Sequence, residues 1–391
     1  MIQAASLFNQ LLQHFPRAEF AALVRKHDAE RGAKGFTCWA QLVAMLFCQM
    51  AHADSLREIC NGLACSLGKL VHLGIGVAPN KSTLAYANKH RPASLYEDLF
   101  YTVLGRFRDE QGLGVRKQKF RFKNKLLSLD STTISLCLEM FPWAKFRRAK
   151  GGVKAHVLLD HDDYLPRYVL ITEARRSDVK MAGAFPLNPG SIIAMDRGYN
   201  DYALFGKWTG EGIFFVTRLK DNAAYEVLEE APVPANRNIR ADQLIRFTGA
   251  KAQKDCPCLL RRVAVWDAVN EREIELLTNL QEFGATTVAA IYKDRWEIEL
   301  FFKALKQNLK VKSFVGTSEN ALRIQIWTAL IAILLLKWLH HLSKAKWSLS
   351  NLASMLRMNL FTYRDLTAWL DNPFGTPPLL PDSQQLTLGL L

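Results

Sequence analysis

Hydrophobic positions in the first 112 residues recur at the spacing of amphipathic helices. Phe8, Leu11, Leu12 and Phe15 fall on one helical face, and the same spacing returns across residues 39–47. This periodicity predicts an all-α N-terminal domain that packs its apolar faces into one core.

Two further helices are predicted at residues 55–63 and 80–91, with a glycine-rich interval between them. Asn80 or Ser82 is expected to cap the second of these helices. That helix is expected to expose four side chains suited to phosphates and base edges, Lys81, Asn88, Lys89 and Arg91. The pattern fits a helix-turn-helix-like DNA reader and equally a plain helical bundle.

From about residue 123 the pattern changes to short apolar or β-branched runs that end in polar turns, which is typical of strands. The runs cover residues 126–136, 153–160, 166–174, 190–199 and 212–220. Three successive strands, followed by helix, strand, helix and strand, predict a mixed α/β sheet with early hairpins. Residues 221–285 are less regular and contain two segments, 259–269 and 273–280, that resemble added strands.

The remaining hydrophobic pattern is helical over residues 286–310 and 320–343. Its most apolar stretch, residues 324–336, is shorter than the ~20 residues needed to span a bilayer. A buried helix is therefore expected there, and no membrane association. The Pro-rich residues 371–385 predict a loose tail.

Charge adds a clue about partners. Lys and Arg outnumber Asp and Glu by 51 to 37, which favours a polyanionic partner, either nucleic acid or an anionic membrane surface. Residues 1–125 hold 18 Lys or Arg against 9 Asp or Glu. The densest basic run, residues 116–125, alternates its cations with Phe120 and Phe122. It fits a DNA-binding segment and equally a solvated linker or edge strand.

The cysteines and the N-terminal segment bear on the compartment. The first twenty residues lack a basic stretch followed by an apolar one, so no signal peptide is expected. Seven cysteines at irregular spacing suggest a reducing cytoplasm. Cys256 and Cys258 have no second pair at zinc-finger spacing, so a structural role is expected for them.

Two acidic residues follow apolar strand segments. Asp130 precedes Ser131 and two threonines, and Asp196 precedes Arg197 and Gly198, which permits a tight turn. Carboxylates at the ends of neighbouring strands can meet in a shared cleft of an α/β sheet. Taken alone, each acid also fits an ordinary turn or helix cap.

The helix predicted after residue 286 carries a more informative pattern. At 100° per residue, Tyr292, Arg295, Glu299 and Lys306 share one stripe, while an adjacent face is apolar. One acid in a basic stripe suits a metal ligand bounded by phosphate-binding groups, although ion pairs four residues apart explain part of the pattern.

Three carboxylates of this kind suit two divalent cations roughly 3.5–4 Å apart that activate one oxygen and stabilise another. Such hard cations prefer oxygen ligands, which these acids supply. The histidines form no convincing competing site. His156, His161, His340 and His341 are expected to be structural or to support the ligands.

The spacing Tyr292-x2-Arg295-x3-Glu299-x6-Lys306 resembles the YREK signature of the insertion-sequence four family of bacterial DDE transposases. Residues 291–332 as a whole are similar to that family. LDSTTI around Asp130 and AMDRGY around Asp196 match its first and second acids. The N-terminal residues are similar to a helical domain found in one branch of the family.

The resemblance implies a ribonuclease H-like catalytic core with a β-rich insertion, preceded by an all-α domain. It implies that Asp130, Asp196 and Glu299 bind two Mg²⁺ ions, with Mn²⁺ as a substitute. Tyr292, Arg295 and Lys306 would contact phosphates near the cut transposon end, and Arg218 and Lys220 would be second-tier DNA contacts. The candidate DNA contacts of the predicted N-terminal reader are Lys81, Lys89 and Arg91. Trp266 would assist a hairpin step, although a packed core tryptophan is the stronger alternative.

The resemblance also implies partners and a domain layout. The partners would be terminal inverted repeats, target DNA and a second copy of the chain, in a bacterial cytoplasm at the nucleoid. The alternatives are a resolvase-like nuclease that cleaves without joining, and a regulator on an inactive scaffold. The expected layout is an N-terminal domain (1–112), a basic linker (113–125), a core (126–220), an insertion (221–285), the last catalytic helix (286–312), a C-terminal helical region (313–370) and a tail (371–391).

Overall fold

The computed structural model describes residues 5–66, 70–109, 112–113, 119–147, 150–235 and 237–378. The chain forms two compact units. Unit 1 comprises residues 1–113 and 303–391, and unit 2 comprises residues 114–302. The predicted N-terminal domain and the C-terminal helical region thus share one unit, which no local pattern in the sequence could show. Arg116 and Lys117 of the basic run, and tail residues 379–391, lie outside the described residues.

Unit 1 is helical, as the apolar spacing predicts. Its core is built on α3 (Cys38–Ala51), in which every residue but the last is buried, and on α12 (Glu319–Leu342). Thr37 and Ser318 cap these helices, each accepting a hydrogen bond from a backbone N–H of the first turn. The other helices are α1 (Leu7–Leu12), α2 (Arg17–Lys26), α4 (Leu56–Ala64), η1 (Val71–Leu73), α5 (Lys81–His90), α6 (Ser94–Asp109), α13 (Leu349–Asn359) and α14 (Leu366–Asp371).

α12 is long and apolar enough to cross a membrane by composition, but 89% of its most apolar window is buried inside the protein. It packs against α3, α5, α6 and α13. A helix that is apolar on all sides is expected at the centre of a core, which confirms the predicted buried helix.

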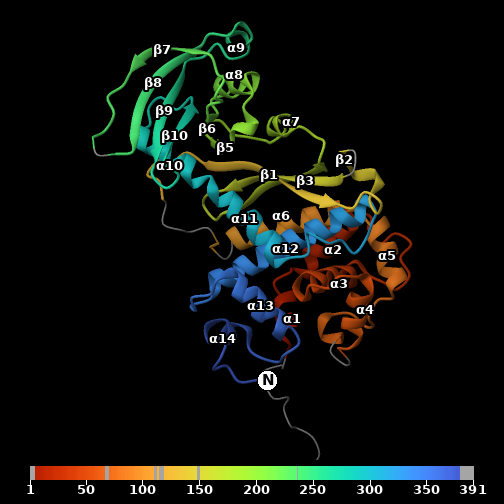
Figure 1. The fold of residues 1–391 in the computed structure, drawn as a ribbon. Helices are drawn as coiled ribbons and strands as arrows, with labels where there is room; N and C mark the ends of the chain where they lie inside the picture. Colours follow the sequence, from red (N-terminus) through yellow and green to blue (C-terminus); the bar gives the residue numbers. More distant parts are fainter. Residues whose placement is uncertain are drawn as a thin grey trace, which may run out of the picture. The chain divides into compact units, whose positions relative to one another are not determined.

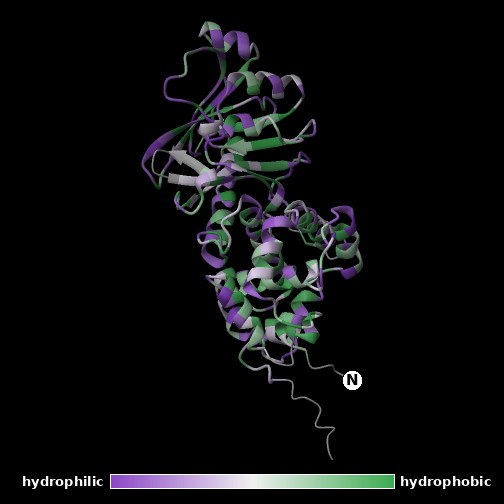
Figure 2. Cartoon of the chain, turned by 90° about the vertical axis from the view of Figure 1, so that its right-hand side faces the viewer, coloured by the Kyte–Doolittle hydropathy of each residue, from purple (hydrophilic) through white to green (hydrophobic). Residues whose placement is uncertain are grey.

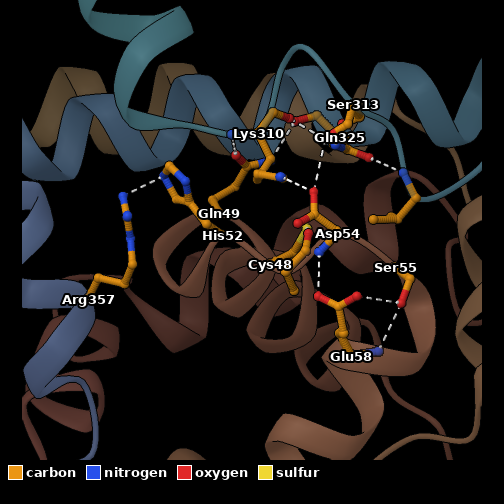
Figure 3. A network of polar contacts seen from close by, with 12 residues as sticks. Cys48, Gln49, His52, Asp54, Ser55, Glu58, Lys310, Ser313, Gln325 and Arg357 are labelled. Atoms are coloured by element: carbon orange, nitrogen blue, oxygen red, sulfur yellow. Dashed lines mark hydrogen bonds and ion pairs between the residues drawn. The ribbon is translucent and has the colours of Figure 1, made fainter.

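A buried polar network connects α3 and α12 to the chain after α11 (Trp296–Asn308) (Figure 3). Gln49 and Gln325 are fully buried. Gln49 accepts from the Lys310 N–H at 2.8 Å, and Gln325 donates to the Lys310 and Ser313 carbonyls, both at 2.8 Å. The Lys310 ammonium pairs with Asp54. Neutral side chains therefore satisfy backbone groups that would otherwise be buried without partners.

Unit 2 is built on one ten-stranded sheet in the order β2-β3-β1-β5-β6-β10-β9-β8-β7, with β4 paired to β3 (Figure 1). β3 pairs antiparallel with β1, β4 and the short β2, whereas β5 joins β1 and β6 in parallel. This confirms the predicted mixed sheet. The strands are β1 (Leu126–Leu136), β2 (Lys145–Arg147), β3 (Lys150–Asp160), β4 (Leu165–Glu173), β5 (Ile192–Met195), β6 (Phe214–Arg218), β7 (Tyr225–Glu230), β8 (Ile239–Phe247), β9 (Leu260–Asp267) and β10 (Arg272–Thr278).

The block after residue 220 continues the same sheet. β10 pairs antiparallel with β6, and β9, β8 and β7 follow as a meander. The two expected strands of this block are β9 and β10. The apolar pattern did not predict three elements of this block, namely β7, β8 and the short helix α9 (Ala250–Asp255). β7 is nearly all exposed and lacks a clear apolar alternation.

The two faces of the sheet have separate cores. On one face, Leu127, Leu129 and Ile193 pack with residues of α8 (Tyr202–Gly210) and α7 (Asp178–Ala182). On the other, Leu126, Ile192 and Val216 pack against α10 (Ala285–Asp294). Figure 2 shows the central strands coloured as hydrophobic, as expected for strands covered on both faces. Strand residues therefore alternate between an α8 face and an α10 face.

The predicted single helix after residue 286 is divided in two. α10 ends at Asp294, and α11 begins at Trp296. Arg295 keeps right-handed helical angles but bonds three residues back, to the Tyr292 carbonyl at 3.3 Å. This tighter turn interrupts the α-helical hydrogen bonding. The expectation of a single continuous helix from Tyr292 to Lys306 is therefore wrong at Arg295.

Candidate active site

Asp130 and Asp196 lie next to each other across a parallel strand pair. The last residues in register between β1 and β5 are Leu129 and Met195, and the two acids follow directly. Neighbouring strands are about 4.8 Å apart, so both carboxylates emerge at one edge of this pairing. Asp130 itself lies within β1. The pairing of β1 with β5 stops at Leu129, but the pairing of β1 with β3 continues to Leu136. The expectation that it ends its strand is wrong.

Alternation along the strands assigns these acids to a face. Leu126, Ile192 and Val216 point toward α10, and side chains an even number of positions later point the same way. Asp130, Asp196 and Arg218 therefore share the α10 face. An Arg218 guanidinium nitrogen, Nη2, lies 3.2 Å from Asp196 Oδ1.

Arg295 connects the first and third acids. It lies between α10 and α11, with 10% of its side chain exposed. Its Nη2 donates to Glu299 Oε1 at 2.7 Å, and its Nη1 lies 3.9 Å from Asp130 Oδ2. Glu299 stands in the first turn of α11. One guanidinium thus faces a carboxylate from the sheet and a carboxylate from the helix.

The electrostatics of Asp130 reflect this crowding. Burial raises its pKa from 3.8 to about 6, while the Ser131 N–H and Arg295 oppose the rise. The charges of Glu299 and Asp196 raise the pKa further. Asp130 therefore interacts electrostatically with both other acids, as expected when carboxylates lie close together at one site.

The donor set fits divalent metal ions. Asp130, Asp196 and Glu299 offer only carboxylate oxygens, the ligands that Mg²⁺ prefers. Among the described residues, no three acidic, histidine or cysteine side chains are close enough to enclose an ion as they stand. Arg295 and Arg218 instead neutralise the carboxylates. A bound cation would replace part of that neutralisation.

Three other predicted DNA contacts lie near these acids or on the same elements. The Tyr292 ring lies 5.6 Å from the Arg295 guanidinium, and burial raises the pKa of Tyr292. Lys306 stands in the last turn of α11, where burial, with a smaller contribution from Lys312, lowers its pKa. Lys220 follows β6 and donates to the Asn200 carbonyl at 3.0 Å.

Trp266 lies away from the acids. It follows Val265 on β9, and Val265 belongs to the α10 core, so Trp266 points to the opposite face of the sheet. Its ring is covered by the Arg240 guanidinium at 5.6 Å. The structure therefore does not bring Trp266 to the candidate site.

The predicted basic helix of unit 1 exposes only part of its polar face. Lys81 and Lys89 are exposed, but Asn88 and Arg91 are buried, so the expectation for those two residues is wrong. Gln41 donates to Asn88 at 2.7 Å, and Arg91 donates to Gln41 at 3.2 Å and to the Phe36 carbonyl. Arg91 holds the ends of helices together and is not available to DNA.

A buried ionic cluster behind Arg295 was not anticipated. Asp294, 4% exposed, accepts from His161 at 2.7 Å and pairs with Lys119. His161 also contacts the Ser128 hydroxyl at 2.6 Å. The cluster ties β1 to the α10–α11 junction two residues before Asp130, and it confirms a structural role for His161. The acidic turn beside His161 was visible in the sequence, but its distant partners were not.

Trp296 was also not anticipated. It follows Arg295 and is 56% exposed, which is unusual for a tryptophan on a helix that packs against a core. It stands three residues before Glu299 and therefore about 60° around the helix from it. Its position inside the Tyr292–Glu299 segment was the available signal.

A mixed sheet with two adjacent carboxylates, and a third on a helix beyond the α10 face, is the arrangement expected of a ribonuclease H-like catalytic core. A model of the Transposase DDE domain matches residues 121–335. This is more than half of the chain, and the chain belongs to the DDE transposase family, whose members use divalent metal ions to act on DNA. Residues 3–76 match a domain of unknown function, DUF4372.

Curated relatives agree with this assignment. The "Putative transposase y4zB" of Sinorhizobium fredii is 31% identical over 316 residues, covering 79% of this chain and 84% of that protein. The "Probable transposase for insertion sequence element IS5377" of Geobacillus stearothermophilus is 29% identical, covering 69% and 70%. The "Putative transposase for insertion sequence element IS4SA" of Synechocystis is 26% identical, covering 66% and 71%.

Proposed function

We propose that this transposase cuts the ends of a bacterial insertion sequence and joins the freed 3′-hydroxyl to target DNA. The observation that carries the proposal is the meeting of Asp130 and Asp196 in adjacent register, with Glu299 linked to Asp130 through Arg295. Phosphoryl transfer needs negative ligands for cations and positive groups for phosphate at one place. The α10 face carries both.

Asp130, Asp196 and Glu299 would hold two divalent cations, Mg²⁺ or in its place Mn²⁺. When bound, such ions activate an attacking oxygen and stabilise the leaving oxygen of an in-line displacement. Before binding, Arg295 and Arg218 form ion pairs with the clustered carboxylates. Once cations neutralise the acids, these guanidinium groups are free to bind phosphate oxygens, for which their planar forks are suited.

DNA at the element end would contact Tyr292, Arg295 and Lys306, with Arg218 and Lys220 at the end of β6. Trp296 offers an exposed ring beside Glu299 on which a base can stack. Trp266 is not proposed for this role, because it faces the other side of the sheet. Lys81 and Lys89 remain candidates for a separate DNA contact on unit 1.

The proposed partners are terminal inverted repeats, target DNA and a second copy of the chain in the synaptic complex. The proposed location is the bacterial cytoplasm, at the nucleoid. Transposition joins two element ends, so at least two active sites are needed in one assembly.

The test is strand transfer from a pre-cut duplex end, taken from DNA flanking the coding region, in the presence of Mg²⁺. The wild-type chain should join this end to plasmid DNA, and D130N, D196N and E299Q should not. E211Q, which removes an exposed acid after α8, is the matched control and should retain wild-type joining. Cleavage without joining by the wild-type chain would instead indicate a resolvase-like nuclease.

A further inference from the structure

The basic run that follows Gly114 has a defined arrangement where the structure describes it. We call residues 119–125 the basic ridge. Phe120 and Phe122 pack against the α10 core, stacked on each other with ring centroids 5.0 Å apart. Phe122 also meets the Phe283 ring edge-on at 5.2 Å. The intervening cations, Arg121 and Lys123, are exposed.

Polar contacts fasten both ends of the basic ridge. At its start, Lys119 pairs with Asp294, whose carboxylate is 4% exposed and also accepts from His161. At its end, Asn124 donates to the Gly190 carbonyl at 2.7 Å, and Lys125 pairs with Asp160 at 2.7 Å. The segment is therefore fixed to the core and is not a solvated linker.

The two central cations are left for a partner. Neither Arg121 nor Lys123 forms an ion pair with a carboxylate of any described residue, in contrast to Lys119 and Lys125. Lys123 also lines a pocket of about 420 Å³. The other polar residues of that pocket are Asn124, Lys125, Arg167, Asn188 and Ser191. Lys125 and Arg167 are paired with Asp160, so Arg121 and Lys123 are the cations here that suit a polyanion.

We propose that the basic ridge binds the phosphate backbone of duplex DNA through Arg121 and Lys123. The identity of that DNA, as the DNA being cut or joined, rests on the proposed function. A membrane surface is less suited as a partner, because both phenylalanines point into the core and offer no apolar anchor to lipid. Cations held by a fixed segment also lose less conformational freedom on binding than cations on a free linker.

The ridge can be tested by the salt dependence of DNA binding. The affinity of the full chain for a duplex of about 30 bp of arbitrary sequence is measured between roughly 50 and 200 mM salt, with a chelator present. Each lost phosphate contact lowers the slope of log K against log salt by about 0.9. The R121Q/K123Q variant should therefore lose about 1.8 from this slope.

The matched control is K251Q/K254Q, which removes the same charge from exposed positions of α9, on the α8 face. It should keep the wild-type slope, and the charge-preserving R121K/K123R should keep it too. An unchanged slope for R121Q/K123Q, or an equal loss in the control, would overturn the proposal. Melting temperatures should be alike, since the four replaced side chains are exposed.

A second variant tests the anchoring. F122A keeps every charge but removes the ring that fixes the ridge, so its affinity for the duplex should fall at each salt concentration while its slope stays near that of the wild type. A wild-type affinity in F122A would contradict a fixed ridge. Because binding is measured without divalent ions, these outcomes are independent of strand transfer. Failure of the wild-type chain to join DNA would reject the proposed function and leave the ridge standing.

Discussion

Two buried polar arrangements, one in each unit, differ in how their groups are satisfied. In unit 1, Gln49 and Gln325 are neutral amides that complete the hydrogen bonding of the chain after α11. In unit 2, a carboxylate with a raised pKa faces Arg295, whose Nε is buried without a hydrogen-bond partner among the described residues. The first arrangement lowers the free energy of the fold, whereas the second holds charged groups at a cost in stability. Such a cost is expected where charge is kept for chemistry.

The largest effect should come from the carboxylates of unit 2. D130N, D196N and E299Q should each lower strand transfer by at least ~10³-fold, because groups that act as one unit are lost together. Binding of a duplex without divalent ions should change little. An acid whose replacement leaves the joining rate unchanged does not belong to the site.

The next largest effect should be on the stability of unit 1. Q325A leaves the Lys310 and Ser313 carbonyls and the Val315 N–H without their partner. Denaturant unfolding should show a loss of roughly 2–4 kcal/mol. Q307A, at an exposed position of α11, is the control and should change stability by less than about 0.5 kcal/mol. Equal losses in the two variants would remove the contrast between the units.

Asp294 should behave as a structural acid of unit 2. Burial opposes its ionisation, but the hydrogen bonds from His161 and Lys119 outweigh burial and lower its pKa. Its ionised form therefore stabilises the fold above the unfolded pKa of about 4, and this contribution is lost as the pH falls through the lowered folded value. D294N should destabilise the protein by about 1–3 kcal/mol at pH 7 and by less at about pH 3 or lower. A pH-independent loss would contradict this role.

Ionisation of Asp130 should destabilise the fold, in contrast to ionisation of Asp294. Its folded pKa of about 6 lies above the unfolded value, so stability falls as the pH rises from about 4 to 6 and stays lower above that range. D130N should therefore be more stable than wild type at pH 7, by at most roughly 1–3 kcal/mol, with little difference at pH 4. Equilibrium unfolding at the two pH values measures this. A variant less stable than wild type at pH 7 would mean that Asp130 stabilises the fold.

Part of the site could be predicted from the sequence because it depends on short segments of the chain, namely apolar strand segments and helical spacing. Asp130 and Asp196 follow apolar runs that pair in parallel, and such pairing fixes their adjacency. Glu299 and Arg295 were identified by their spacing, which survives the tight turn because Arg295 keeps helical angles. The resemblance to a known family supplied the roles that spacing alone left open.

The rest depends on contacts between distant segments. Arg91 follows a helix that fits a DNA reader, but Gln41 and Phe36, about fifty positions earlier, bury it. The Asp294 cluster joins residues more than 130 positions apart. Trp266 faces the other side of the sheet because its neighbour Val265 belongs to the α10 core. No periodicity encodes these pairings, since each is set by how elements pack.

The most direct test of the central claim is Mn²⁺ binding to the full chain with a pre-cut duplex end, followed by electron paramagnetic resonance. The account predicts that the wild-type chain and E211Q bind Mn²⁺ alike, and that D130N, D196N and E299Q each lose this binding. Undiminished Mn²⁺ binding in all three variants would contradict the assignment of these carboxylates as the metal ligands.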